Sequence, residues 1–214
     1  MVAEVKHQAS FRSMQESTAE EWRDIVGPAS VSQRAFPDRV MEQLERLAGD
    51  SGGFAVDRLE HSLQTATRAH RDGRDDEYVV CALLHDVGDL LCPSNHADMA
   101  AAMLKPYVSE QNHWLVAHHT IFQGYYYLHH LGMDRDMREI YRGHPHFEHT
   151  AQFCHLYDQN SLDPDYESMP LEAFRPMVTR VLERPKQDFL LPEDGWRQPK
   201  PGNLFWRLVT GRRS

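Results

Sequence analysis

The chain has 214 residues, of which 41% are hydrophobic and 26% charged, an ordinary composition for one globular domain with a sizeable core. Its formal net charge is −9 and no lysine or arginine block stands out, which disfavours nucleic acid or an anionic membrane surface as a partner. Three scattered cysteines do not form a secreted disulfide framework, and no apolar run is long enough to span a membrane. We therefore expect a soluble, cytoplasmic protein.

Helical patterns follow one another along the chain after a polar N-terminal arm, residues 1–35. Apolar residues at helical spacing, bounded by capping residues, glycines or prolines, predict helices over 37–48, 56–71, 77–86, 96–105, 110–131, 134–141, 145–158 and 171–182. No strand-like alternation of any length is present, so we expect an all-α fold, with one helical bundle over 36–183.

The C-terminal stretch, residues 184–214, is rich in proline and breaks regular structure. It carries the aromatic residues Trp196, Phe205 and Trp206. These rings favour a tail that packs on the body of the protein or on a partner subunit, which would allow a homodimer.

Six candidate metal ligands fall in successive predicted elements: His61, His85, Asp86, His96, His119 and Asp158. A bundle interior is the usual place for a helical metal site. Neighbouring helix residues point about 100° apart, so adjacent His85 and Asp86 suit two ions, with the carboxylate between them. Imidazoles and carboxylates without thiolate indicate iron, manganese or zinc. Taken alone, a histidine such as His61 is more often a core side chain.

Three motifs resemble the HD-domain superfamily: Arg58-Leu59-Glu60-His61-Ser62-Leu63-Gln64, Leu83-Leu84-His85-Asp86-Val87-Gly88, and the late Tyr157-Asp158. The segments around His96 and His119 are similar in spacing to the mixed-valent diiron oxygenases. That group includes myo-inositol oxygenase and the bacterial C–P-cleaving hydroxyphosphonate oxygenases. The resemblance covers residues 56–158 and implies a single HD-domain bundle with a dinuclear centre in its core.

The resemblance implies that Asp86 bridges two iron ions in a mixed-valent Fe(II)/Fe(III) state, with O2 as the cosubstrate. The ligands of one iron would be His61, His85 and Asp158, and those of the other His96 and His119. His118 is the alternative to His119. His119 is preferred because its spacing from Ser109 and the aromatic segment that follows it match the family.

The positions that hold the phosphonate in the aminoethylphosphonate-cleaving members differ in this chain. Asp89 stands in place of a histidine, Gln123 in place of a lysine, and His155 in place of an arginine. Those members also carry a tyrosine and a glutamate ahead of the first ligand, and the corresponding positions in this chain are Ser51 and Phe54. The resemblance therefore extends to the metal site but not to the substrate pocket.

Other residues could hold an anionic or zwitterionic substrate. An arginine such as Arg138 suits phosphonate or carboxylate, although a single arginine is more often a solvated surface charge. The aromatic run 122–127 could enclose a quaternary ammonium group by cation–π attraction, with Asp89 as counter-charge, or could simply pack in the core. The predicted substrate contacts are Asp89, His118, Gln123, Tyr126, Arg135, Arg142 and His155.

Two functions fit these patterns. An O2-dependent oxygenase would cleave a C–P or C–C bond of a small hydroxylated substrate. The best candidate is a 1-hydroxy-2-(trimethylammonio)ethylphosphonate-like compound, which would give phosphate and a carboxylate. An HD-type phosphohydrolase acting on small phosphate esters would use most of the same ligands. His96 and His119 together in a short chain favour the oxygenase, whereas the missing phosphonate-binding residues weigh against it.

Overall fold

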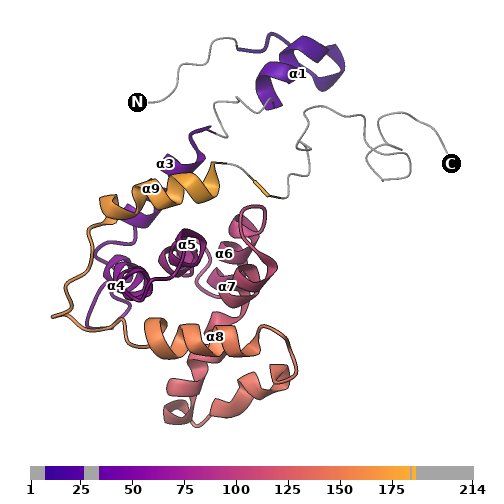
Figure 1. Ribbon diagram of the computed structural model, residues 1–214. Helices are drawn as coiled ribbons and strands as arrows, with labels where there is room; N and C mark the ends of the chain where they lie inside the picture. Colours follow the sequence, from indigo (N-terminus) through magenta and orange to yellow (C-terminus); the bar gives the residue numbers. More distant parts are fainter. Residues whose placement is uncertain (1–7, 27–33, 184, 187–214) are drawn as a thin grey trace. The chain divides into compact units, whose positions relative to one another are not determined.

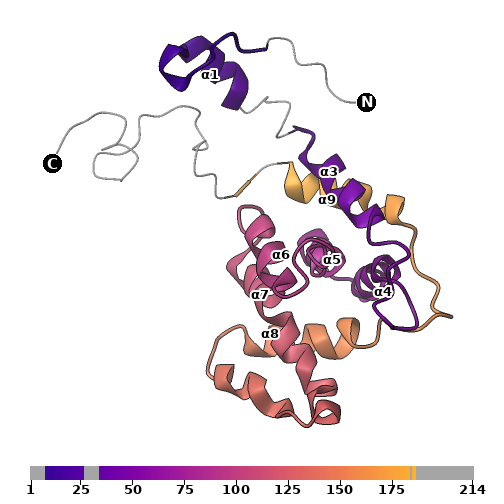
Figure 2. The same ribbon diagram turned by 180° about the vertical axis from the view of Figure 1, so that it is seen from behind.

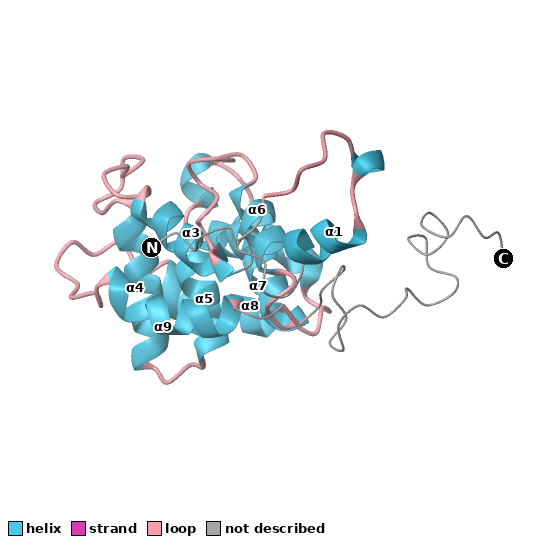
Figure 3. Cartoon of the chain, turned by 90° about the horizontal axis from the view of Figure 1, so that it is seen from above, coloured by secondary structure: helices cyan, strands magenta, loops and turns pink. Residues whose placement is uncertain are grey.

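The computed structural model describes residues 8–26, 34–183 and 185–186. The chain divides into two compact units, one of residues 35–187 and the other of residues 1–34 and 188–214. All regular structure in the described residues is helical, which confirms the predicted all-α class (Figure 3). None of the described helices is both long and apolar enough to cross a membrane. Apart from residues 185 and 186, the predicted tail lies outside the described residues.

In the smaller unit, the described residues form the 3₁₀ helix η1 (Met14–Glu16) and the helix α1 (Ala19–Val26). The helices of the larger unit are α3 (Phe36–Glu45), α4 (Arg58–Arg71), α5 (Asp76–Leu84), α6 (His96–Leu104), α7 (Glu110–Gln123), α8 (Phe147–Phe153) and α9 (Leu171–Leu182). Between and after them lie the 3₁₀ helices η2 (Gly124–Tyr126), η3 (Leu128–Leu131) and η4 (Arg135–Tyr141), and the π-helix η5 (Cys154–Asp158).

Helix α5 is the centre of the larger unit. Its residues from Tyr78 to Leu84 are all buried, as expected of a helix that is apolar on every side. In Figures 1 and 2, α4 lies on one side of α5 and α6 and α7 on the other, with α3 and α9 above them and α8 below. Helix α5 contacts α4, α7 and α9, so other helices of the bundle cover several of its sides.

Capping side chains fix the beginnings of three of these helices. Each accepts a hydrogen bond from a backbone N–H three residues further on, and these caps are Asp57 for α4, Asp75 for α5 and Ser109 for α7. Such a cap stabilises a helix by about 1 kcal/mol. Because α4 and α7 carry His61 and His119, the caps also help to set the positions of two predicted ligands.

Several predicted helices end a few residues early, and two α-helices end five or more residues short of their predicted bounds. Helix α7 stops at Gln123 instead of continuing to about residue 131, and the chain tightens into η2 and η3. Gly124 permits the tightening, because a Cβ there would lie 2.7 Å from Cδ1 of Leu128. The helix predicted over 145–158 is an α-helix only as α8, and its last turn widens into η5.

Candidate metal centre

The six predicted ligands lie together inside the larger unit. His61 is on α4, His96 is the first residue of α6, and His119 is on α7. His85 and Asp86 directly follow the last residue of α5, and Asp158 ends η5. Five separate elements thus contribute to one cluster.

Asp86 lies between two pairs of imidazoles. Its Oδ2 is 3.4 Å from Nε2 of His61 and 3.3 Å from Nε2 of His85. Its Oδ1 is 3.2 Å from Nε2 of His96 and 3.0 Å from Nε2 of His119. The two Nε2 atoms within each pair are 3.2 Å and 3.3 Å apart. Ligand atoms about 2.1 Å from one ion, at right or tetrahedral angles, are about 3.0–3.4 Å apart, so the spacing fits two bridged ions.

Asp158 completes the first of these two groups. Its Oδ1 is 3.3 Å from Nε2 of His61 and 3.7 Å from Nε2 of His85, and it accepts a hydrogen bond of 2.7 Å from Nε2 of Gln123. The side chain is fully buried, and within the described part of the chain its Oδ2 has no hydrogen-bond partner. An unpaired buried carboxylate oxygen is destabilising, and a bound cation would satisfy it.

Hydrogen bonds fix which ring nitrogen carries the proton in three of the four predicted ligand histidines. Three rings donate Nδ1–H to backbone carbonyls: His61 to Ser161 (2.9 Å), His85 to Ala82 (2.8 Å) and His119 to Val116 (2.8 Å). In neutral rings of the first group, the Nε2 lone pairs of His61 and His85 then face each other across 3.2 Å. Such lone pairs repel unless a cation lies between them.

The electrostatics of the cluster favour positive charge. Burial opposes protonation of His85, but Asp86 and Asp158 outweigh it and raise the His85 pKa well above its usual range. Burial likewise opposes ionisation of Asp86, yet the neighbouring imidazoles hold its pKa well below the usual range, and the pKa of Asp158 is lowered in the same way. The centre therefore attracts either protons or metal ions, and metal binding has to displace protons.

A cavity of about 450 Å³ opens beside this cluster, a size that suits a small ligand. His61, Asp86 and His96 line it on the cluster side. Phe54 and Tyr127 contribute aromatic surface. Metal ions held by the cluster would therefore face a space that a small substrate can enter.

Three of the predicted substrate contacts line this cavity, and a fourth, His155, contacts one of them. Asp89, Gln123 and Tyr126 line it directly, and the hydroxyl of Tyr126 is hydrogen-bonded to Nδ1 of His155 at 3.1 Å. Gln123 also contacts Asp158, so it touches the metal cluster as well as the cavity. Ser51 lines the cavity too, as does Phe54.

The other predicted substrate contacts are not among the described residues that line the cavity. His118 stacks on Trp114, with ring centroids 4.1 Å apart, and donates Nδ1–H to its carbonyl. Arg135 covers the ring of Tyr125. Arg142 forms ion pairs with Glu139 and Glu148, so its charge is already paired at the surface.

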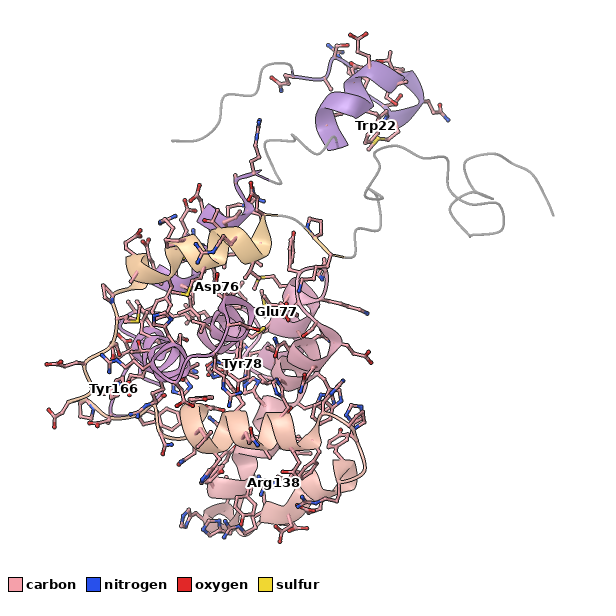
Figure 4. All side chains as sticks on the ribbon, viewed as in Figure 1. Trp22, Asp76, Glu77, Tyr78, Arg138 and Tyr166 are labelled. Atoms are coloured by element: carbon pink, nitrogen blue, oxygen red, sulfur yellow. The ribbon has the colours of Figure 1, made fainter. Side chains whose placement is uncertain are left out.

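Arg138 shares the arrangement of its neighbour Arg135. Its guanidinium carbon lies 3.8 Å from the centroid of the Tyr125 ring, compared with 4.0 Å for Arg135. Figure 4 shows Arg138 on η4, whereas Tyr78 belongs to the central helix α5. The two arginines therefore pack on the aromatic segment, and neither reaches the cavity.

Among the cavity residues that sequence reasoning missed, Arg58 is the charged one with the clearest role. It is the one residue with a permanent positive charge among the described residues that line the cavity, and it is ion-paired with Asp50 and Asp89. Arg58 precedes the ligand His61 by three residues, so the two share a face of α4. The spacing of three residues between Arg58 and His61 was the sequence signal that could have identified Arg58.

Gly88 lies where the turn after α5 passes the beginning of α6. A Cβ at this position would lie 2.8 Å from the carbonyl oxygen of His96 and 3.1 Å from its Cα. Because backbone atoms cannot rotate away, Gly88→Ala should displace His96 and lower the free energy of unfolding by about 1–3 kcal/mol. Thermal melting of the metal-free protein and metal content after loading would measure both effects.

The matched control for this prediction is Gly143→Ala. A Cβ added there has nothing within 4 Å, so stability and metal content should stay at the wild-type level. Wild-type stability and full metal content in Gly88→Ala would show that the close approach at Gly88 does not position His96.

Comparisons with known protein families and with curated proteins find no match for this chain. Its function therefore has to be argued from the geometry of the centre and from the residues that form it.

Proposed function

We propose that the protein is a dinuclear metal-dependent oxygenase of the HD-domain type, which cleaves a C–P or C–C bond of a small hydroxylated substrate. The proposed metals are two irons, as a mixed-valent Fe(II)/Fe(III) pair, with O2 as cosubstrate. The observation that carries the proposal is the position of Asp86, whose two oxygens each face a different pair of imidazoles. A cytoplasmic location and a homodimer stay predictions from the sequence.

When bound, a pair of irons would supply the activation of O2 and the removal of a hydrogen from the substrate carbon. The residues of the chain would hold the two ions and orient the ligand rings around them. Asp86 would keep the two ions side by side, and Asp158 would fix the more buried one. The hydrogen bonds of the ligand rings to backbone carbonyls keep each Nε2 aimed inward.

The overall reaction balances without an external reductant. A 1-hydroxyphosphonate, R–CH(OH)–PO₃H₂, and O2 would give R–COOH and H₃PO₄. The C–P bond is broken, the carbon is oxidised, and both oxygen atoms of O2 end in the products. The protein therefore needs only the substrate and O2 once the metal centre has been loaded.

The residues of the cavity favour a zwitterionic substrate. The rings of Tyr126 and Tyr127 line the cavity and can attract a quaternary ammonium group. The acidic end of the substrate would lie toward the metal ions, which are a strong local positive charge. Our best candidate is a 1-hydroxy-2-(trimethylammonio)ethylphosphonate-like compound, which would give phosphate and a carboxylate.

The geometry also favours a second function, a phosphohydrolase acting on small phosphate esters. Two ions close enough to share the carboxylate of Asp86 could clamp the attacking and leaving oxygens of a displacement. The ligands would be the same, so the distinction lies in the substrate and in the need for O2.

Release of inorganic phosphate by iron-loaded protein would test the proposal. The substrates would be 1-hydroxyphosphonates with hydrogen, amino and trimethylammonio substituents, together with simple phosphate esters, each with and without O2. Protein carrying Asp86→Asn, loaded in the same way, would serve as the blank for adventitious iron.

Phosphate from a hydroxyphosphonate only in the presence of O2 is the expected result. Phosphate from esters regardless of O2 would replace the oxygenase with the phosphohydrolase. No phosphate from either set would contradict C–P cleavage and direct the search to carbon-only hydroxylated substrates.

A further inference from the structure

We propose that Asp89 is a positioning residue, which orients His96 toward the second metal ion, and that Arg58 anchors Asp89 for this role. The inference rests on the dinuclear centre of the proposed function. It gives Asp89 a place in the support of the metal ligands instead of a contact with the substrate.

His96 is the least enclosed of the four ligand histidines. Its side chain is 20% exposed, compared with 1% for His119 in the same group. It is also the first residue of α6, a helix whose N-cap Asn95 makes no capping hydrogen bond through its side chain. Neither burial nor a helix cap therefore holds this ring in place.

The hydrogen bonding of His96 also differs from that of the other three rings. Its Nδ1 is 3.4 Å from the nearest backbone carbonyl, that of Pro93, whereas the other rings have carbonyls within 2.9 Å. Oδ1 of Asp89 lies closer, at 3.1 Å from Nδ1 of His96. The Nδ1 proton has a long hydrogen bond to Pro93, and the Asp89 carboxylate lies close enough to accept this proton after a small rotation of the ring, which leaves Nε2 free to face Asp86 and an ion.

Arg58 holds Asp89 in this position. One NH group of the guanidinium pairs with Oδ2 of Asp89, and Nε of Arg58 is 3.1 Å from Oδ2 of Asp50. The backbone N–H of Asp89 donates to the carbonyl of Asp86 at 3.0 Å. Asp89 is thus fixed at both carboxylate oxygens and through its main chain.

This arrangement leaves Asp89 poorly suited to a cationic substrate group. One oxygen faces His96 and the other Arg58, and the side chain is only 7% exposed. A carboxylate that accepts the second ring proton of a metal-bound histidine fixes its orientation and raises its basicity. Asp89 has the partners that this role requires.

Metal titration of the apo-protein would test the inference without a substrate. Two equivalents of Co²⁺ would be added to wild type and to Asp89→Asn in competition with a chelator, and the visible absorption of each bound ion would be followed. Asp89→Asn should bind one of the two ions about 10–100-fold more weakly and shift its absorption, with the other ion unchanged. Asp98→Asn, which removes the same charge from an exposed position on α6, should bind both ions like wild type.

The outcomes separate this inference from the function on which it rests. A wild type that binds fewer than two ions would overturn both the dinuclear centre and the role of Asp89. If wild type binds two ions, either of two results for Asp89→Asn would overturn the role of Asp89 alone. The variant would bind both ions as tightly as wild type, or it would bind both equally more weakly. If Asp89→Asn does not fold, Arg58→Gln should weaken the same single ion, and wild-type binding in that variant would overturn the inference.

Discussion

Asp86→Asn should leave the protein without turnover and with fewer than two bound ions. Each oxygen of Asp86 lies within 3.4 Å of two imidazole nitrogens, so one substitution removes an anionic ligand from both groups. The neutral amide has nearly the same shape, but it cannot offer an anionic oxygen to each ion. We expect more than about 100-fold weaker binding of at least one ion, beyond the loss typical of an outer-shell partner. Elemental analysis after desalting and the phosphate assay would measure both effects.

Two comparisons make this result specific. Asp98→Asn carries the same chemical change on α6 and should keep both ions and full turnover. Circular dichroism should show that Asp86→Asn retains the helical fold. Two tightly bound ions and wild-type turnover in Asp86→Asn would contradict a carboxylate-bridged centre.

Phe153→Ala should cause one of the largest losses of stability in the bundle. The ring is fully buried and lies edge-on to His85, with centroids 5.5 Å apart, while Tyr78 and Tyr157 enclose it further. Truncation would leave a cavity between α5 and α8, and we expect the free energy of unfolding to fall by about 3–5 kcal/mol. Because the lost ring also supports His85, the same variant should retain metal less well. Urea denaturation of the apo-protein would measure the first effect and elemental analysis the second.

Phe153→Leu, which keeps most of the apolar volume, should lose distinctly less stability than the alanine variant. Ile140→Ala is the surface control, since this side chain is 75% exposed and its loss should change stability by no more than about 0.5 kcal/mol. A loss below about 1 kcal/mol in Phe153→Ala would show that the neighbouring rings close the cavity.

Most of the helices could be predicted from the sequence because their local signals agree. Helix α4 has apolar residues at helical spacing and a glycine just after its end, and the structure begins it two residues later than predicted, after the cap Asp57, and ends it at the predicted residue. Helix α9 matches its predicted bounds although it contains Pro176. Where capping, periodicity and helix breakers point to the same bounds, tertiary packing has little to change.

The parts that could not be predicted depend on packing between distant segments. Helix α7 ends at Gln123, where Gly124 packs closely under the Leu128 side chain, and nothing in the local pattern marks either this end or the widening of η5. The six predicted metal ligands could be chosen from the sequence because they fall in successive helices and in motifs that resemble a known family, and the structure brings them together. The residues that line the cavity were harder to predict, since Arg135 and Arg142 differ from Arg58 only in what surrounds them after folding.

The wide turn η5 sets the spacing between two polar networks, one formed by Tyr157 and the other by Asp158. Its backbone hydrogen bond runs from Gln159 to Cys154, one residue further apart than in an α-helix. That turn lets the neighbours Tyr157 and Asp158 serve different partners: Tyr157 is hydrogen-bonded to Asp72 just after α4, and Asp158 faces the imidazoles. Inserting or deleting a single residue here would satisfy one network only by breaking the other. We therefore expect the segment to tolerate no change in length, although two of its side chains, His155 and Leu156, are exposed.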